Sequence, residues 1–178
     1  EAFFCICSFQ SGNTVFRFIL PECGYNIREE QISLSKKMFI GFTEKQVAIC
    51  EAEVGTGKTL SYLVAALCAK FYNEQKYKQV MPVTITTATI ELQKALVEKE
   101  IPRLSDILMK YGIIRKPLSV VLRKGKEHYI CPFRLNDHIK TLNQHRDNYS
   151  KTIALLKQIG KMPLGIDLDK YQIRGALK

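Results

Sequence analysis

The stretch EAEVGTGKTLSYLVA, residues 51–65, places a glycine-rich loop between two apolar segments. The run before it, QVAIC at residues 46–50, contains Val and Ile and predicts a short buried strand. The residues after Lys58 are rich in leucine and alanine, and they predict a helix. Strand, loop and helix in this order form the context in which proteins bind phosphate groups.

The loop fits the phosphate-binding pattern G-x-x-x-x-G-K-[ST] in all but its first position. Ala52 replaces the first glycine, and the remaining positions are filled by Glu53, Val54, Gly55, Thr56, Gly57, Lys58 and Thr59. We expect Lys58 to contact the β and γ phosphates of ATP and the Thr59 hydroxyl to hold Mg²⁺. The helix starting near Lys58 would add its N-terminal amides and its dipole. A glycine turn could match so short a pattern by chance, but the flanking elements favour nucleotide binding.

The rest of the chain predicts an α/β fold. Two further buried strands are expected, PVTITTA at residues 82–88 and LSVVLRK at residues 118–124. Other helices are expected at residues 28–40, 91–112 and 134–160, the second interrupted near Pro102. Strands that alternate with helices predict a parallel sheet flanked by helices. AFFCICSFQ and TVFRFIL flank SGN at residues 11–13, which predicts an N-terminal β-hairpin.

Basic residues are concentrated in the last third of the chain. Residues 1–109 carry 12 Lys+Arg and 12 Asp+Glu, whereas residues 110–178 carry 15 and 5. Such a region is typical of proteins that bind nucleic acid, and equally of a solvated helical face whose acidic counterpart lies elsewhere. No apolar run reaches the ~18 residues of a membrane span, so we expect no membrane partner and a cytoplasmic location.

Six cysteines occur, but nothing else in the sequence suggests secretion. Cys50 and Cys68 lie in apolar segments, where free cysteine behaves as a small hydrophobic residue. We expect most of the six to be reduced core residues.

With the flanking segments included, the chain resembles the N-terminal part of DinG-like DNA helicases, relatives of the XPD group in helicase superfamily 2. The segment EAEVGTGKTLSYLVAAL resembles their motif I, in which Glu53 is typical, and YNIREEQ at residues 25–31 resembles their nucleotide-base motif. The resemblance implies a RecA-like fold in which Gln31 reads the adenine edge and Arg28 supports it. Glutamine suits this role because its amide both donates and accepts hydrogen bonds.

TITTATIELQKALVEKEIPRL, residues 84–104, is similar to the family's motif Ia, which touches the backbone of single-stranded DNA. The resemblance implies nucleic-acid contacts by Thr86, Thr87, Thr89 and Gln93. Such short uncharged donors bind phosphates without reading sequence. Taken alone, Thr87 or Thr89 would be interpreted as a helix N-cap, and only the match of the whole segment favours DNA contact.

LRKGKEHYICPFRL, residues 122–135, resembles the family segment that carries the first ligand of an iron–sulfur cluster. Cys131 occupies the ligand position, and Lys126, also a candidate nucleic-acid contact, matches the approach to it. No cysteine follows Cys131, so this chain alone cannot complete a cluster. Cys131 is equally well interpreted as a former or partial ligand or as an ordinary thiol.

The resemblance covers roughly residues 25–135. Together with the residue patterns it predicts three regions: a hairpin lead-in at 1–22, part of the first RecA-like domain at 23–133, and a basic helical region at 134–178 where the iron–sulfur insert could begin. The acidic box, the second RecA-like domain and its arginine finger have no counterpart here, so we expect the isolated polypeptide to hydrolyse ATP poorly.

Two other function classes stay open on the residues alone. One is a small P-loop kinase or a transporter-type ATPase. The other is a catalytically inactive helicase-like module that only binds DNA.

Overall fold

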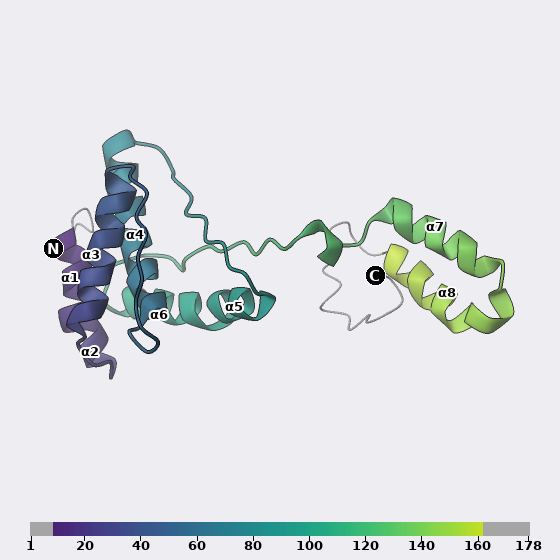
Figure 1. Ribbon diagram of the computed structural model, residues 1–178, viewed down its shortest axis with the longest axis horizontal. Helices are drawn as coiled ribbons and strands as arrows, with labels where there is room; N and C mark the ends of the chain where they lie inside the picture. Colours follow the sequence, from purple (N-terminus) through teal and green to yellow (C-terminus); the bar gives the residue numbers. More distant parts are fainter. Residues whose placement is uncertain (1–8, 162–178) are drawn as a thin grey trace. The chain divides into compact units, whose positions relative to one another are not determined.

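The computed structural model describes residues 9–161, which fall into two compact units divided between Leu122 and Arg123. The first unit contains helices α1 (Phe9–Thr14), η1 (Val15–Ile19), α2 (Leu20–Glu22), α3 (Glu29–Thr43), α4 (Lys58–Tyr77), α5 (Ile90–Ala95), η2 (Leu96–Glu100) and α6 (Ile101–Lys110) (Figure 1). The second unit contains the short helix η3 (Lys126–His128) and helices α7 (Pro132–Asn143) and α8 (Arg146–Gly160).

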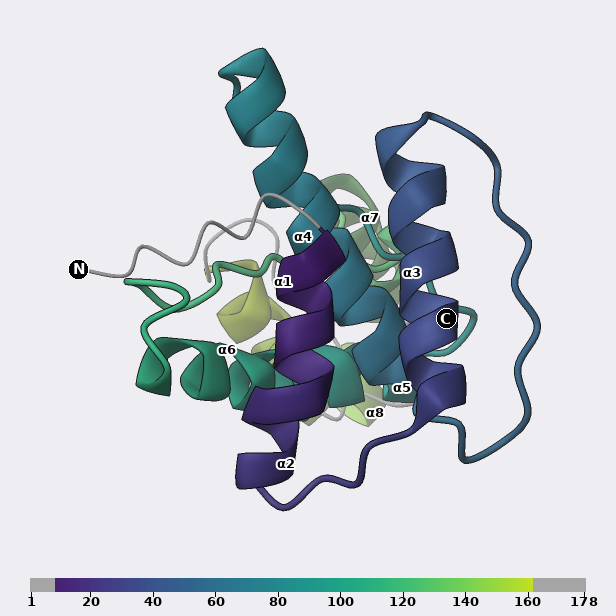
Figure 2. The same cartoon turned by 90° about the vertical axis from the view of Figure 1, so that its left-hand side faces the viewer.

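The first unit packs around α4. Helices α1 and α3 lie along α4, and α6 crosses this group (Figure 2). The buried face of α4 consists mainly of small and branched side chains, Leu63, Val64, Ala65, Cys68 and Ala69. Small residues let neighbouring helices approach closely. Cys68 is part of this buried face, and burial raises the pKa of its thiol to about 12. Cys68 is therefore a reduced core residue, as expected from its apolar surroundings in the sequence.

The predicted N-terminal hairpin is wrong over the described residues 9–22. This segment is continuously helical, through α1, η1 and α2. Its buried hydrophobic residues are Val15, Phe16, Ile19 and Leu20, a helical spacing that places one face in the same core as residues of α3 and α4. The imperfect alternation of TVFRFIL therefore belongs to a helix. The first part of the expected hairpin, residues 1–8, lies outside the described residues.

The predicted parallel sheet, and with it the α/β fold class, is also wrong. No strand occurs between residues 9 and 161. The three expected strands, residues 46–50, 82–88 and 118–124, are irregular segments, and Val47 and Ile49 are 93% and 96% exposed. Their composition favours an extended backbone, but a strand also requires a hydrogen-bonded neighbour, which local sequence cannot provide.

The expected helix at residues 91–112 is present as α5, η2 and α6 in succession. The π-helical turn η2 directly precedes Pro102, which lies in the first turn of α6, where its missing N–H costs little. Gly112 then ends the helix with φ 68°. The Ile113 amide donates to Leu108 O (2.8 Å) and the Gly112 amide to Met109 O (2.9 Å), which is the Schellman arrangement.

The second unit is a helical hairpin. Its core contains Leu135 from α7 and Ile153, Leu156 and Ile159 from α8. The sequence predicted one helical region over residues 134–160, but the helices break at Gln144 and His145. Tyr149, within α8, has a non-helical φ of −124° and is exposed. Among the described residues, no helix is long and apolar enough to span a membrane.

Candidate nucleotide-binding loop

The glycine-rich loop at residues 51–57 ends directly at the start of α4, as the sequence predicted. Gly55 and Gly57 have φ values of 90° and 84°, in the left-handed region that other residues rarely adopt. Gly57 is also the N-cap of α4, and no side chain caps that helix end. The first amides of α4 have no partner within the helix, so they are available to an anion.

Lys58 folds back over the loop that precedes it. Its Nζ donates to Ala52 O at 2.7 Å and to Glu53 O at 2.8 Å. Thr56 closes the same turn, because its Oγ1 donates to Glu53 O at 2.7 Å. Glu53 therefore contributes its carbonyl to the loop, whereas its side chain is exposed. The Lys58 ammonium group is thus held against the backbone of the loop that precedes it.

The beginning of α3 holds the loop from the other side. Gln31 Nε2 donates to Gly57 O at 2.9 Å, and the Arg28 guanidinium donates to Gly55 O. The Gln31 side chain is only 6% exposed. The fully buried Ser61 hydroxyl, on α4, donates to Gln31 O at 3.1 Å. The two residues of the proposed base motif are thus brought to the loop, although 26 and 27 positions separate them from their partners.

Thr59 occupies the first turn of α4 and is half-buried. A side-chain hydrogen bond joins it to Tyr62, whose pKa is raised mainly by burial. A hydroxyl next to the loop lysine is a suitable oxygen ligand for Mg²⁺, which takes most of its ligands from water and phosphate. The role of Thr59 as a metal ligand stays a prediction.

The threonines of the proposed DNA-contact motif bond mainly within their own segment. Thr89 is the N-cap of α5, and its Oγ1 accepts from the Leu92 amide at 3.3 Å. Thr87 Oγ1 donates to Thr89 O at 3.0 Å, and Thr86 is exposed. The Gln93 Oε1 is buried without a hydrogen-bond partner. The capping interpretation thus applies to Thr89, and the DNA contacts stay a prediction.

Lys126 and Cys131 belong to the second unit and are both exposed. Lys126 begins η3, and Cys131 is the N-cap residue of α7. Over residues 9–161, no three His, Cys, Asp or Glu side chains gather as metal ligands. An iron–sulfur cluster needs several thiolates at one place, so the described residues do not fit such a group.

Two features of the site were not predicted. Ser61 is a small polar residue next to the apolar run of α4, four positions after Gly57, and this position is a signal that could have marked it. Arg17, which pairs with Glu29 at the start of α3, carries no local signal because its partner is twelve positions away.

The chain is similar to bacterial helicases and exonucleases. It is 30% identical over 149 residues to the 3'-5' exonuclease DinG of Bacillus subtilis, covering 83% of this chain and 14% of that protein. It is 34% identical over 134 residues to the probable ATP-dependent helicase YpvA of the same organism, covering 75% and 19%. The ATP-dependent helicase DinG of Mycobacterium tuberculosis is 29% identical over 143 residues, covering 80% and 20%. No family model and no solved structure matches the chain.

All three relatives are DinG proteins or a probable ATP-dependent helicase, so the similarity is to DinG and related helicases. The chain is DinG-like over most of its length, and the resemblance inferred from its motifs is confirmed. It spans between 14% and 20% of the length of these relatives.

Proposed function

We propose that this chain is the MgATP-binding part of an ATP-dependent DNA helicase. The observation that carries the proposal is the convergence of Lys58, Gln31 and Arg28 on one glycine loop at the start of a 20-residue helix. In this proposal Lys58 leaves the carbonyls of Ala52 and Glu53 to contact the β and γ phosphates. The α4 amides receive the remaining phosphate oxygens.

Mg²⁺ would be held by the Thr59 hydroxyl together with the phosphates. A bound Mg²⁺ would offset part of the negative charge of the phosphates. Gln31 uses one N–H of its amide to hold the loop. The second N–H and the amide oxygen would then bind the adenine edge. Arg28 would keep the Gly55 peptide in place beside it.

Lys58→Ala is expected to weaken MgATP binding at least roughly tenfold, since charge-assisted contacts to phosphate are lost. Isothermal titration calorimetry of residues 1–178 measures the dissociation constant. Lys37→Ala is the matched control, because Lys37 is an exposed lysine on α3 and its loss changes the net charge equally. Equal affinity of the wild type and Lys58→Ala, or no MgATP binding by the wild type, would contradict the proposal.

The basic second unit is proposed to bind the phosphate backbone of single-stranded DNA. Its two helices carry five basic residues and two acidic ones, Asp137 and Asp147. The basic side chains are all exposed: Arg134, Lys140, Arg146, Lys151 and Lys157. The helicase names of the relatives support a nucleic-acid partner for this chain.

Binding of oligo-dT is expected to weaken steeply with salt, with a slope of about −0.7 per phosphate contact in a plot of log affinity against log salt concentration. The double variant Lys151→Gln, Lys157→Gln loses two positive charges and should make this slope shallower by about 1.4. Fluorescence anisotropy at several salt concentrations measures it. The control replaces Lys37 and Lys99, two exposed lysines of the first unit. If both double variants change the slope equally, binding is not a property of α8.

A further inference from the structure

We propose that Arg17 is a positioning residue for the nucleotide site, acting through Glu29 on the start of α3. This inference rests on the proposed binding of MgATP by the loop. It concerns a residue that lies outside the loop and outside the base motif.

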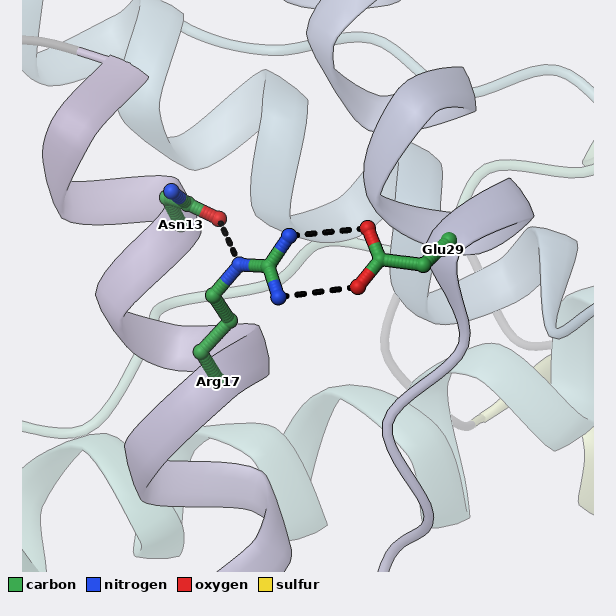
Figure 3. Close-up of polar contacts among 3 residues, drawn as sticks. All are labelled: Asn13, Arg17 and Glu29. Carbon is green, nitrogen blue, oxygen red and sulfur yellow. Dashed lines mark hydrogen bonds and ion pairs between the residues drawn. The ribbon is translucent and has the colours of Figure 1, made fainter.

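Arg17 uses all three nitrogens of its guanidinium (Figure 3). Its Nη1 and Nη2 donate to the two carboxylate oxygens of Glu29, each at 2.8 Å, and its Nε donates to Asn13 Oδ1 at 3.0 Å. A guanidinium bound by two parallel contacts fixes the orientation of the carboxylate as well as its distance. The Glu29 side chain is therefore held in one geometry.

Arg17 lies on a helical segment whose other side is buried in the core. Its neighbours Val15, Phe16 and Ile19 are buried in the core, so the η1 backbone cannot shift without disturbing the packing. Asn13, one turn earlier, holds the Nε side of the guanidinium. Through Arg17, the position of the Glu29 carboxylate therefore depends on the packed core of the first unit.

Glu29 is the first residue of α3, and Arg28 is its N-cap. Arg28 donates to Gly55 O and Gln31 to Gly57 O, so the residues on both sides of Glu29 hold the loop. Arg28 has no side-chain capping bond at this helix end. The contact from Arg17 therefore fixes the helix start from which both loop contacts project.

The connection that leads to α3 is braced at two further points. The Tyr111 hydroxyl donates to Glu22 Oε2 at 2.6 Å, a contact that raises the pKa of Tyr111. Arg103 lies over the Tyr25 ring, 4.8 Å from its centroid. These contacts hold the earlier part of the connection, whereas Arg17 contacts the first residue of α3 itself.

Arg17→Gln and Glu29→Gln are each expected to weaken MgATP binding roughly twofold to fivefold, the effect of removing one exposed, well-oriented ion pair. Calorimetry on residues 1–178 measures the dissociation constant at a temperature at which circular dichroism shows each variant to be folded. The charge-exchanged double variant Arg17→Glu, Glu29→Arg should recover most of the affinity. Lys70→Gln is the control, because it removes the ion pair with Glu74, which lies within α4.

A double-mutant cycle with Arg28→Ala separates positioning from a general effect on stability. If Arg17 acts through the loop contacts, Arg17→Gln should have a clearly smaller effect on the affinity once Arg28→Ala is present, because only the Gln31 contact is then left to position. A merely structural role would instead give additive effects. Additive effects of Arg17→Gln and Arg28→Ala would overturn the inference, and so would unchanged affinity in both Arg17→Gln and Glu29→Gln. Neither result would affect the proposed function as long as the wild-type chain binds MgATP. Absence of MgATP binding by the wild type would overturn both.

Discussion

Gly57→Ala is expected to weaken MgATP binding at least roughly tenfold and to lower the free energy of unfolding by about 1–3 kcal/mol. Gly57 has φ 84°, which strains any residue with a side chain. A Cβ at this position would lie 2.2 Å from Gln31 Nε2 and 3.0 Å from Gln31 Cδ. Alanine would therefore expel the Gln31 amide from its contact with Gly57 O. Calorimetry with MgATP and chemical denaturation measure the two effects.

Gly55→Ala is the matched control for this substitution. Gly55 has a similar φ of 90°, but a Cβ there would meet nothing within 4 Å. Its cost should consist of backbone strain alone, whereas Gly57→Ala adds the displacement of Gln31. In a Gln31→Ala background the two glycine variants should become equally destabilising, because the clashing atoms are gone. If Gly57→Ala stays the costlier variant in that background, the contact with Gln31 is not the cause.

Local sequence identified the helices between residues 28 and 112 and the loop. Leucine and alanine after Lys58 predicted α4, the loop pattern predicted where it begins, and Pro102 and Gly112 marked a distortion and an end that the structure contains. Each of these features depends on residues within about one or two helical turns of each other. The proximity of Arg28 and Gln31 to the loop came from the resemblance to DinG-like helicases, since no local pattern indicates a contact across 26 positions.

The strands could not be predicted in the same way. Val47 and Ile49 have the composition of a buried strand, yet both side chains are exposed and their segment is unpaired. A strand is stabilised by cross-strand neighbours, so composition indicates only that a segment tolerates an extended backbone. The pair Arg17 and Glu29 was missed for a related reason, because ion pairs between distant positions leave no periodic trace.

Phe16→Ala and Phe18→Ala should differ strongly in stability, and this difference tests the helical N-terminal segment directly. Phe16 is 2% exposed and Phe18 is 65% exposed. Removing the buried ring should lower the free energy of unfolding by about 3–5 kcal/mol, whereas the exposed ring should contribute less than about 0.5 kcal/mol. Guanidinium denaturation followed by circular dichroism measures the loss, and hydrogen exchange of the α4 amides assigns it to the first unit.

In a β-hairpin the same two residues would point to one face, because side chains two positions apart share a face of a strand. Phe16→Ala and Phe18→Ala would then have similar costs, and Arg17 would lie on the opposite face together with Val15 and Ile19. Phe16→Leu keeps most of the buried volume and should cost less than about 1.5 kcal/mol, so it remains measurable if the alanine variant unfolds the first unit. If substitutions at positions 16 and 18 lower the free energy of unfolding equally, the helix is contradicted. The packing of η1 that holds Arg17 in place would then be contradicted as well. A large cost at position 16 alone agrees with the burial of η1 against α3 and α4.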